Sequence, residues 1–429
     1  MVRNAFTAGI DFTKYFKNRL YYIDVKGMLS SLHGSAGAIT ALQNSVAHYY
    51  QRASSADYLG VDPTRRSLTG TGGYVKVGRK GNAKWNFSET FTWSSPGFDL
   101  NDMGYMKETD YLMNETEIMY RQTDIWKIFR YNAFTLSQKN MWNYGGTPFS
   151  NNASLRWQSM TMNRYEWDVK ETFAWNWLDS RLLRGGPDVR FGSYFLTSAK
   201  FNTDKAKRMM FMLKYEGDHN FEGNRFNTIS PSLTFRLGNH VYLSGQLDYA
   251  WNTDEMQYVA TTSPLSSSSL APYYYVMGHM DQKTYGLTLK LQVNVTPDIS
   301  IQFYGAPFTS IAKYDDFKLA ADTKSHTFEN RFQRIDPDQL TYADGVYTIG
   351  EGAGQMPFRN PDFRFNEFRS NLVARWEYLP GSTLYFVWEH RMSNRDNWYS
   401  SGWGSNLDRM WGLPATNTFM IKMNYWFNL

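Results

Sequence analysis

Hydrophobic and polar residues alternate along most of this chain with a period of two. The last twelve residues show the pattern clearly: Phe419, Ile421, Met423, Tyr425, Phe427 and Leu429 alternate with Met420, Lys422, Asn424, Trp426 and Asn428. Side chains of a strand point alternately to opposite faces, so residues 418–429 are predicted to form a strand with one apolar and one mostly polar face. This length suits a tilted membrane-crossing strand, which needs roughly 9–11 residues.

The same alternation recurs in many other segments. In residues 287–296, apolar residues at odd positions oppose polar residues such as Lys290 and Gln292. Residues 85–93 and 165–177 alternate too, although Glu89 and Glu171 interrupt their apolar faces. These runs are longer than the roughly 5–6 residues of an average strand, and many have an aromatic residue near one end. Aromatic residues at strand ends are typical of the girdles at a membrane interface.

Turn-forming residues divide the chain into a series of hairpins. The predicted hairpins pair 6–16 with 20–30, 74–79 with 84–93, 110–121 with 128–140, 154–162 with 164–177, 191–201 with 209–218, 228–237 with 241–252, 285–295 with 299–308, and 371–379 with 383–391. With the terminal strand, about seventeen strands are visible. Short turns alternate with long connections at 32–73, 94–109, 142–153, 179–190, 219–227, 253–284, 309–367 and 393–416.

This rhythm of short and long connections favours a membrane barrel. Such barrels have short periplasmic turns and long extracellular loops, whereas a soluble sandwich has no reason to keep the rhythm. No run approaches the roughly 18 apolar residues of a membrane helix. We therefore expect an all-β protein, a large antiparallel transmembrane β-barrel formed by residues 1–429 and located in the bacterial outer membrane. A soluble sugar-binding β protein is the alternative, because an aromatic content of 17% suits both.

The start of the chain predicts that the barrel is truncated. Residues 1–4 lead directly into an alternating run, without the apolar segment of a signal peptide. The first connection is short and therefore periplasmic, so residues 6–16 would run from outside to inside. Bacterial barrels have an even number of strands, and seventeen is odd. We expect that upstream strands are missing.

Composition excludes several classes of site. The chain has no cysteine, so it forms neither disulfides nor thiolate metal sites. A net charge of +5 is too small to indicate a nucleic-acid partner. The seven histidines form no metal pattern, and the acidic pairs in residues 309–367 lack the spacing of a calcium loop. We expect no cofactor and no metal.

No catalytic motif stands out. A hydrolase of the Ser–His type needs a nucleophile and a base held together by a third group. His48 and other histidines lie in predicted loops with serines nearby, but no nucleophile-elbow motif accompanies them. The sequence therefore favours a non-enzymatic role, and an outer-membrane enzyme with its site in the extracellular loops stays as the alternative.

Three motifs in the predicted loops carry a family resemblance. The first is residues 43–52, followed by 66–70; the second is residues 95–105, with Asp110 beyond it; the third is residues 183–187. With the aromatic terminal strand, they resemble the bacterial family that carries domain of unknown function 5916. The candidate structural or functional residues in these motifs are His48, Gln51, Arg52, Pro96, Gly97, Phe98, Asp99, Asn101, Asp102, Arg184, Gly185, Gly186 and Pro187.

The resemblance implies an outer-membrane barrel of a kind found mainly in Bacteroidota and related Gram-negative groups. Members of that family resemble barrels preceded by a sandwich similar to family-nine carbohydrate-binding modules, which this chain lacks. The resemblance therefore implies passage or docking of glycans or other polymers, with outer-membrane lipid and periplasmic or outer-membrane proteins as further partners. It supplies no catalytic residues. The chain departs from the family pattern after Arg52, where Ala53-Ser54 stands in place of Pro-Asp.

The motif residues also have a direct physical meaning. Pro96-Gly97 and Gly185-Gly186-Pro187 are sequences that form sharp turns. Asp99 and Asp102 are residues that cap exposed backbone amides. Residues 36–51 carry apolar positions at helical spacing, and we expect this helix to pack on the barrel rim rather than to plug the lumen.

Overall fold

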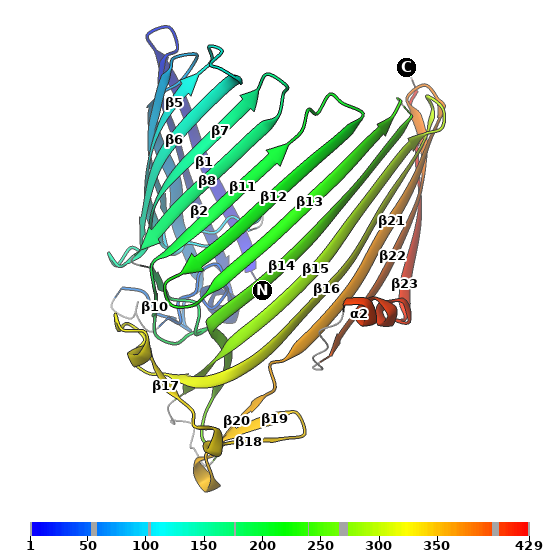
Figure 1. The fold of residues 1–429 in the computed structure, drawn as a ribbon. Coiled ribbons are helices and arrows are strands. Elements are labelled where there is room, and N and C mark those ends of the chain that lie inside the picture. The colour runs from blue at the N-terminus through cyan, green and yellow to red at the C-terminus, as the bar shows by residue number, and fades with distance from the viewer. Residues whose placement is uncertain are drawn as a thin grey trace.

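A computed structural model describes residues 2–52, 58–101, 104–175, 177–238, 240–265, 273–396 and 403–427. The protein is built around one large, curved antiparallel sheet (Figure 1). The long strands are β1 (Val2–Phe16), β2 (Tyr21–Gly34), β3 (Ser67–Arg79), β4 (Trp85–Ser94), β5 (Tyr111–Gln122), β6 (Phe129–Trp142), β7 (Pro148–Thr161), β8 (Glu166–Trp175), β11 (Tyr194–Asn202), β12 (Met209–Asn220), β13 (Arg225–Leu237), β14 (Val241–Thr262), β15 (Tyr274–Asn294), β16 (Ile299–Ala320), β21 (Phe363–Leu379), β22 (Ser382–Asp396) and β23 (Ala415–Asn424).

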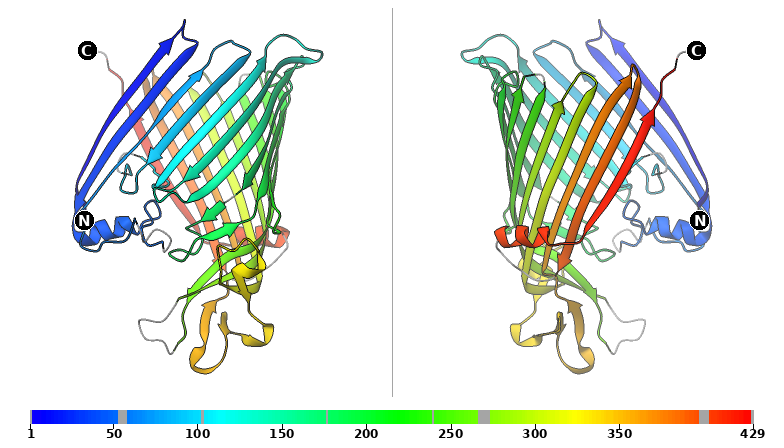
Figure 2. Two further views of the ribbon diagram at one scale, coloured as in Figure 1. Left: turned by 90° about the vertical axis from the view of Figure 1, so that its left-hand side faces the viewer. Right: turned by 90° about the vertical axis from the view of Figure 1, so that its right-hand side faces the viewer.

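Each long strand pairs with the next one along the chain, so the sheet is a continuous meander. The described residues give it eighteen strands, of which the short β17 (Phe332–Arg334) only extends the end of β16. The other seventeen form the wall. Within the described residues β1 pairs only with β2, and β23 pairs only with β22, so the wall has two edges rather than a closed ring (Figure 2). Because seventeen is odd, both edge strands start at the same end of the wall.

The remaining elements gather at the end of the wall that carries the long connections (Figures 1 and 2). Neither helix in the described residues is long and apolar enough to cross a membrane. The small elements are α1 (Ala36–Gln43), α2 (Trp403–Trp411), a hairpin of β9 (Trp177–Asp179) and β10 (Val189–Phe191), and a small sheet of β18 (Leu340–Ala343), β19 (Val346–Ile349) and β20 (Met356–Arg359). The described residues also form three short 3₁₀ helices: Glu329–Arg331, Pro337–Gln339 and Gly352–Gly354.

The strand register joins the apolar positions of neighbouring strands into rows. Residues paired directly across two strands point to the same face of a sheet. One row of paired positions runs Leu243, Leu291, Phe303, Leu372, Trp388, Phe419. The next position on each strand gives the row Ser244, Lys290, Tyr304, Asn371, Glu389, Thr418. One face of the wall is therefore apolar and the other mostly polar, as the alternation predicts.

Aromatic pairs occur near both ends of the apolar face. At the end with the short turns, Trp85 packs on Tyr120 with ring centroids 5.0 Å apart. At the end with the long connections, Phe173 packs on Phe195, also with centroids 5.0 Å apart. The cross-strand register brings these rings together, since Trp85 pairs with Tyr120 and Phe173 with Phe195. Two levels of aromatic residues on an apolar face are the arrangement of interfacial girdles.

Both carboxylates that interrupt the apolar face have partners on the next strand. Glu89 pairs in register with Thr116, whose hydroxyl donates a 2.6 Å hydrogen bond to Glu89 Oε2. The hydroxyl of Thr197 donates a 2.7 Å hydrogen bond to Glu171 Oε2. The hydrogen bonds keep these carboxylates from being left unsatisfied on an apolar surface.

Several predicted boundaries are wrong. The terminal strand ends at Asn424 rather than continuing to residue 429, because its partner β22 begins at Ser382 and offers no backbone beyond that point. The helix predicted over 36–51 ends at Gln43. There the chain folds back, Tyr49 has a φ of 54°, and the N–H of Tyr50 donates to Gln43 O.

Three predicted long loops also contain strand. β3 begins at Ser67, within the loop predicted over 32–73. The loops predicted over 253–284 and 309–367 hold the outer parts of β14, β15 and β16, which are 22, 21 and 22 residues long. These three strands extend past the ends of the other wall strands and pair with one another there. Buried residues such as Met256, Val276 and Met277 pack between these extensions and the loops. Runs of consecutive buried residues, at 276–278 in β15 and 309–312 in β16, interrupt the clean alternation that marks the wall.

The environments of the two faces can be compared by placing a charged residue on each of them in turn. Replacing Leu291 by Arg puts a guanidinium on the apolar face, whereas replacing the adjacent Gln292 by Arg puts it on the polar face. If the apolar face meets lipid, L291R is expected to cost about 2–4 kcal/mol near the midplane and Q292R much less. Urea unfolding in lipid vesicles, followed by tryptophan fluorescence, measures both. Equal losses would contradict the assignment of the faces.

Candidate functional site

The three sequence motifs converge at the end of the wall that carries the long connections. The first follows α1 and β2, the second follows β4, and the third lies between β9 and β10. The hydroxyl of Tyr49 donates to Arg181 O at 3.4 Å, and the N–H of Thr109 donates to Ala47 O at 3.0 Å. Segments that are far apart in the sequence are thereby joined. We call residues 43–52, 95–101 and 183–187, with the residues that bind them, the loop assembly.

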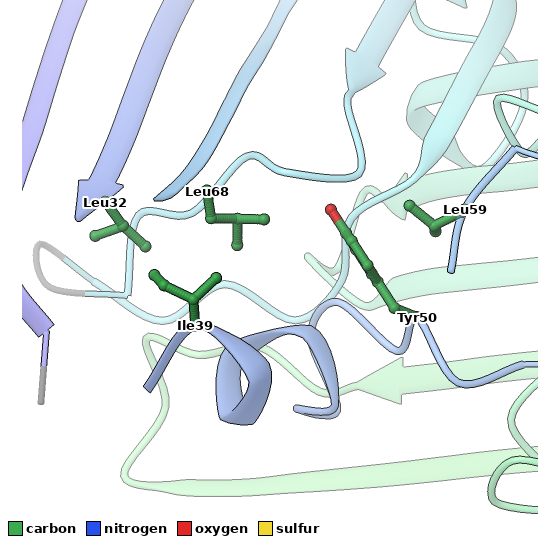
Figure 3. Close-up of a cluster of buried hydrophobic side chains, with 5 residues drawn as sticks. All are labelled: Leu32, Ile39, Tyr50, Leu59 and Leu68. Atoms are coloured by element: carbon green, nitrogen blue, oxygen red, sulfur yellow. The ribbon is translucent and has the colours of Figure 1, made fainter. Parts of the chain in front are cut away.

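A small apolar cluster fixes the first motif to the wall. Ile39 of α1 packs with Leu32 at the end of β2 and Leu68 at the start of β3, and all three are buried. Tyr50 and Leu59 close the cluster from the loop that follows α1 (Figure 3). Burial raises the pKa of Tyr50 to about 12, so its ring stays neutral. The cluster therefore fixes residues 43–52 to the ends of β2 and β3.

The second motif is held by close contact with glycines. A Cβ at Gly70 would lie 2.1 Å from the backbone nitrogen of Phe98, and one at Gly72 would lie 2.4 Å from the Phe98 ring. A Cβ at Gly97 would lie 2.4 Å from Thr69 O. Only glycine leaves room for this approach of two backbones. The loop therefore lies directly on β3, and Phe98 is buried there.

A buried ion pair links the first and second motifs. His48 Nε2 lies 2.8 Å from Asp99 Oδ2, and the side chains of the two residues are 0% and 5% exposed. His48 Nδ1 lies 2.8 Å from Pro96 O, so both ring nitrogens face hydrogen-bond acceptors. The hydroxyl of Thr109 donates to the same Pro96 O at 3.1 Å. These contacts fix the imidazole between the first and second motifs.

Both the backbone and the side chain of Asp99 form hydrogen bonds. Its backbone N–H donates to Ser30 Oγ at 2.8 Å, and its Oδ1 accepts the N–H of Asn101 at 2.8 Å. Burial alone would raise the pKa of Asp99, but the hydrogen bonds from His48 and Asn101 outweigh it and hold the pKa below its usual value. The predicted capping role of Asp99 is thus seen at Asn101. Asp102 lies outside the described residues.

A second buried pair ties the same segments to β5. Arg52 Nη2 donates to Asp110 Oδ2 at 2.5 Å, and the hydroxyl of Tyr58 donates to the same oxygen at 2.6 Å. The N–H of Tyr144 donates to Asp110 Oδ1 at 3.1 Å. Burial, and then the hydrogen bond to Asp110, raise the pKa of Tyr58. Asp110 thus accepts hydrogen bonds from two connections, the one before β3 and the one between β6 and β7.

The third motif forms a tight turn beside the first. Arg184 and Gly185 have positive φ values of 50° and 113°, and Pro187 follows them. Leu183 is fully buried between the loop and the outer parts of β14 and β15, and the Arg184 guanidinium lies 4.5 Å from the centre of the Tyr258 ring. A Cβ at Gly185 would touch Gln51 Cγ at 3.5 Å, and one at Gly186 would meet the Tyr275 ring at 2.7 Å. The predicted turn is therefore packed on both sides.

A pocket of about 380 Å³ lies between the loop assembly and the polar face of the wall. Arg52 and Asp110 form one side, and Lys139 and Ser150, from β6 and β7, form another. The remaining lining residues are Lys107, Glu108, Thr109, Met141, Phe149, Trp177, Leu178, Asp179, Ser180 and Arg181. Most of these lie outside the three motifs, and sequence reasoning missed them because strands far apart in the sequence bring them together.

The loop assembly acts chemically as a rigid support. His48 has no exposed surface and both its nitrogens are engaged, so it does not face a substrate. Within the described residues no group of three or more His, Cys, Asp or Glu residues is arranged to hold a metal ion. The chemistry that is open to solvent lies in the neighbouring pocket, where charged side chains stand beside aromatic ones.

The fold defines a large all-β protein with a meandering antiparallel sheet. The chain belongs to the family with domain of unknown function 5916, whose model matches residues 35–429. The resemblance carried by the three motifs is thereby confirmed. Among solved structures, the siderophore receptor PirA from Acinetobacter baumannii is similar at 9% identity and a TM-score of 0.40, with 98% of this chain and 70% of that chain covered. No curated protein matches the chain.

The buried pair of His48 and Asp99 predicts that the free energy of unfolding depends on pH. The pKa of Asp99 is lowered in the folded state, so its stabilising effect is present above about pH 4, the unfolded value, and is lost as the pH falls through the folded pKa. D99N removes the charge and is expected to cost about 3–5 kcal/mol near neutral pH. Its unfolding free energy should also change less between pH 6 and pH 3 than that of the wild type.

Urea unfolding at the two pH values measures this difference. D124N is the matched control, because Asp124 is exposed in a short turn. A D99N protein with the same stability and the same pH dependence as the wild type would contradict a stabilising ion pair at this position.

Replacing Gly70 by alanine adds one methyl group and tests the contact between Gly70 and Phe98. G70A would force the Phe98 backbone away from β3 and is expected to destabilise the protein by about 1–3 kcal/mol or more. G60A is the control, because a Cβ at Gly60 has no atom within 4 Å. Thermal unfolding measures both variants. If G70A were as stable as G60A, the loop would not lie on the strand as described.

Proposed function

We propose that this chain forms the wall of a bacterial outer-membrane β-barrel that passes or docks glycans or other polar polymers. The observation that carries the proposal is the register of the wall, which joins apolar positions of successive strands into one face and polar positions into the other. The apolar face contacts lipid, and the polar face lines a wet lumen.

The exposed apolar side chains support the membrane part of the proposal. Large side chains on the apolar face are exposed even on strands with neighbours on both sides, including Ile118, Leu136 and Leu155 at 43%, 54% and 57%. Soluble proteins rarely expose large contiguous apolar patches. A soluble sugar-binding protein would need another layer to cover this face. In the described residues α2 packs on one end of it, where Trp411 contacts Phe368, whereas residues such as Leu243 and Phe386 remain exposed.

The polar face supports the passage or docking of polar molecules. It carries paired charged groups of both signs. Arg156 of β7 pairs with Asp168 of β8 at 2.5 Å, and Lys214 pairs with Glu216 along β12 at 2.7 Å. A lumen wall of this kind is wetted by water and offers donors and acceptors to a hydroxylated chain. The glycan part of the proposal draws on the family's sugar-module-like neighbour and on the mixed lining of the pocket.

The sidedness of the wall follows from its connections. The short turns, such as residues 80–82 and 380–381, face the periplasm, and the loop assembly lies on the extracellular side. Every long connection of the wall, with α1 and α2, stands at that same end (Figure 2). An enzyme with its site in these loops is the alternative, and the buried, fully engaged His48 does not favour it.

Cysteine labelling on intact cells tests location and sidedness together. The chain has no native cysteine, so N82C and N101C each supply one thiol, in a short turn and in the loop assembly respectively. An impermeant maleimide should label N101C on intact cells and N82C only after lysis. The reverse pattern would invert the topology, and recovery of the protein in the soluble fraction without detergent would overturn the membrane proposal.

Liposome swelling tests the transport part separately. Vesicles that contain the chain should admit neutral oligosaccharides faster than vesicles without it, whereas a docking role predicts retention of the oligosaccharide on the solubilised protein. Neither entry nor retention would overturn the proposed role while leaving the membrane location intact.

A further inference from the structure

We propose that the pocket beside the loop assembly binds an acidic sugar, that is, a sugar unit that carries a carboxylate. This inference rests on the proposed function and names the class of glycan that the polar side of the wall would take. The pocket measures about 380 Å³, which lies in the range of roughly 300–1,000 Å³ typical of small-molecule sites.

The pocket is built from rigid elements. Lys139 and Met141 project from β6 and Ser150 from β7, at positions that share the polar face of the wall. Arg52 and Asp110 also line the pocket, and their buried ion pair is fixed by Tyr58 and by the N–H of Tyr144. A site supported by strands and by a buried hydrogen-bond network keeps its shape without a ligand.

Among the residues that the structure describes, two cations of the pocket make no ion pair, although Glu115 lies opposite Lys139 in the register of β5 and β6. Arg181 pairs with Glu108 at 3.1 Å, and Arg52 pairs with Asp110. One oxygen of Asp179 accepts the backbone N–H groups of Arg181 and Leu182. Lys107 and Lys139 make no ion pair with any residue that the structure describes. The groups free to meet a ligand charge are therefore ammonium groups.

The carboxylates and apolar side chains in the rest of the pocket lining favour a sugar over a simple anion. Carboxylates of Glu108 and Asp179 accept hydrogen bonds from hydroxyl groups but repel a phosphate ion. Trp177, Phe149 and Leu178 provide apolar surface that suits the C–H face of a pyranose ring. Trp177 is held in place by Phe191 and Tyr194, with ring centroids 5.7 and 5.2 Å away. Donors, acceptors, apolar surface and free cations together match a carboxylated polyol.

Saturation-transfer NMR of the detergent-solubilised chain tests the proposal with three probes: D-glucuronate, D-glucose and inorganic phosphate. Glucuronate should bind, and equimolar glucose or phosphate should displace little of it. K107Q and K139Q should each weaken glucuronate binding by about tenfold, the size expected for the loss of one hydrogen bond to a charged group. K290Q is the matched control, because Lys290 lies on the polar face of β15, outside the pocket.

Each result has one interpretation. Equal binding of glucose, full displacement by phosphate, or unchanged affinity in both K107Q and K139Q overturns the acidic-sugar site. Heat-modifiable migration of each variant shows that it is folded, and a loss of affinity in K290Q equal to that in K139Q also overturns the site. Failure of the pocket in a protein that passes the maleimide and swelling tests leaves the proposed function standing. Failure of those tests overturns the function whatever the NMR shows.

Discussion

The structure depends on keeping a two-residue register through a long antiparallel meander. A slip of one residue between two strands would move every apolar side chain of one strand to the polar face. The register keeps rows such as Leu243, Leu291 and Phe303 in line, and it also brings aromatic pairs such as Trp85 and Tyr120 into contact. An apolar face, a mostly polar face and two levels of aromatic residues all follow from this one constraint.

The loop assembly packs directly on strands of this wall. Glycines at 70 and 72 remove side chains from β3 where the segment around Phe98 lies on it. That approach leaves polar groups buried, and the pairs of His48 with Asp99 and Arg52 with Asp110 satisfy them. Removal of either partner of such a pair leaves the other partner buried without compensation, so the pairs disfavour other arrangements of these loops. We infer that the three motifs define a shape, and that the pocket next to them carries the chemistry.

The sequence allowed the number of wall strands and their order to be predicted, because a period of two is strong wherever one side of a strand is polar. It did not reveal the outer parts of β14–β16, where runs of consecutive residues, such as 276–278 in β15, are buried. It also overestimated the helix after Ser35, since a fold-back at Gln43 depends on contacts with Tyr50. The motif residues were found, but partners such as Tyr58 and Thr109, and the lining around Lys139, depend on long-range pairing that no local pattern reports.

The central claim is that one face of this wall meets lipid and the other meets water. Nitroxide labels on single cysteines at successive positions 287–293 of β15, in reconstituted vesicles, test it directly. Collision rates with oxygen, which concentrates in lipid, and with a water-soluble nickel chelate report the surroundings of each label. The account predicts oxygen maxima at the odd positions and nickel maxima at the even ones. Equal accessibility at odd and even positions, or nickel maxima at Leu289 and Leu291, would contradict it.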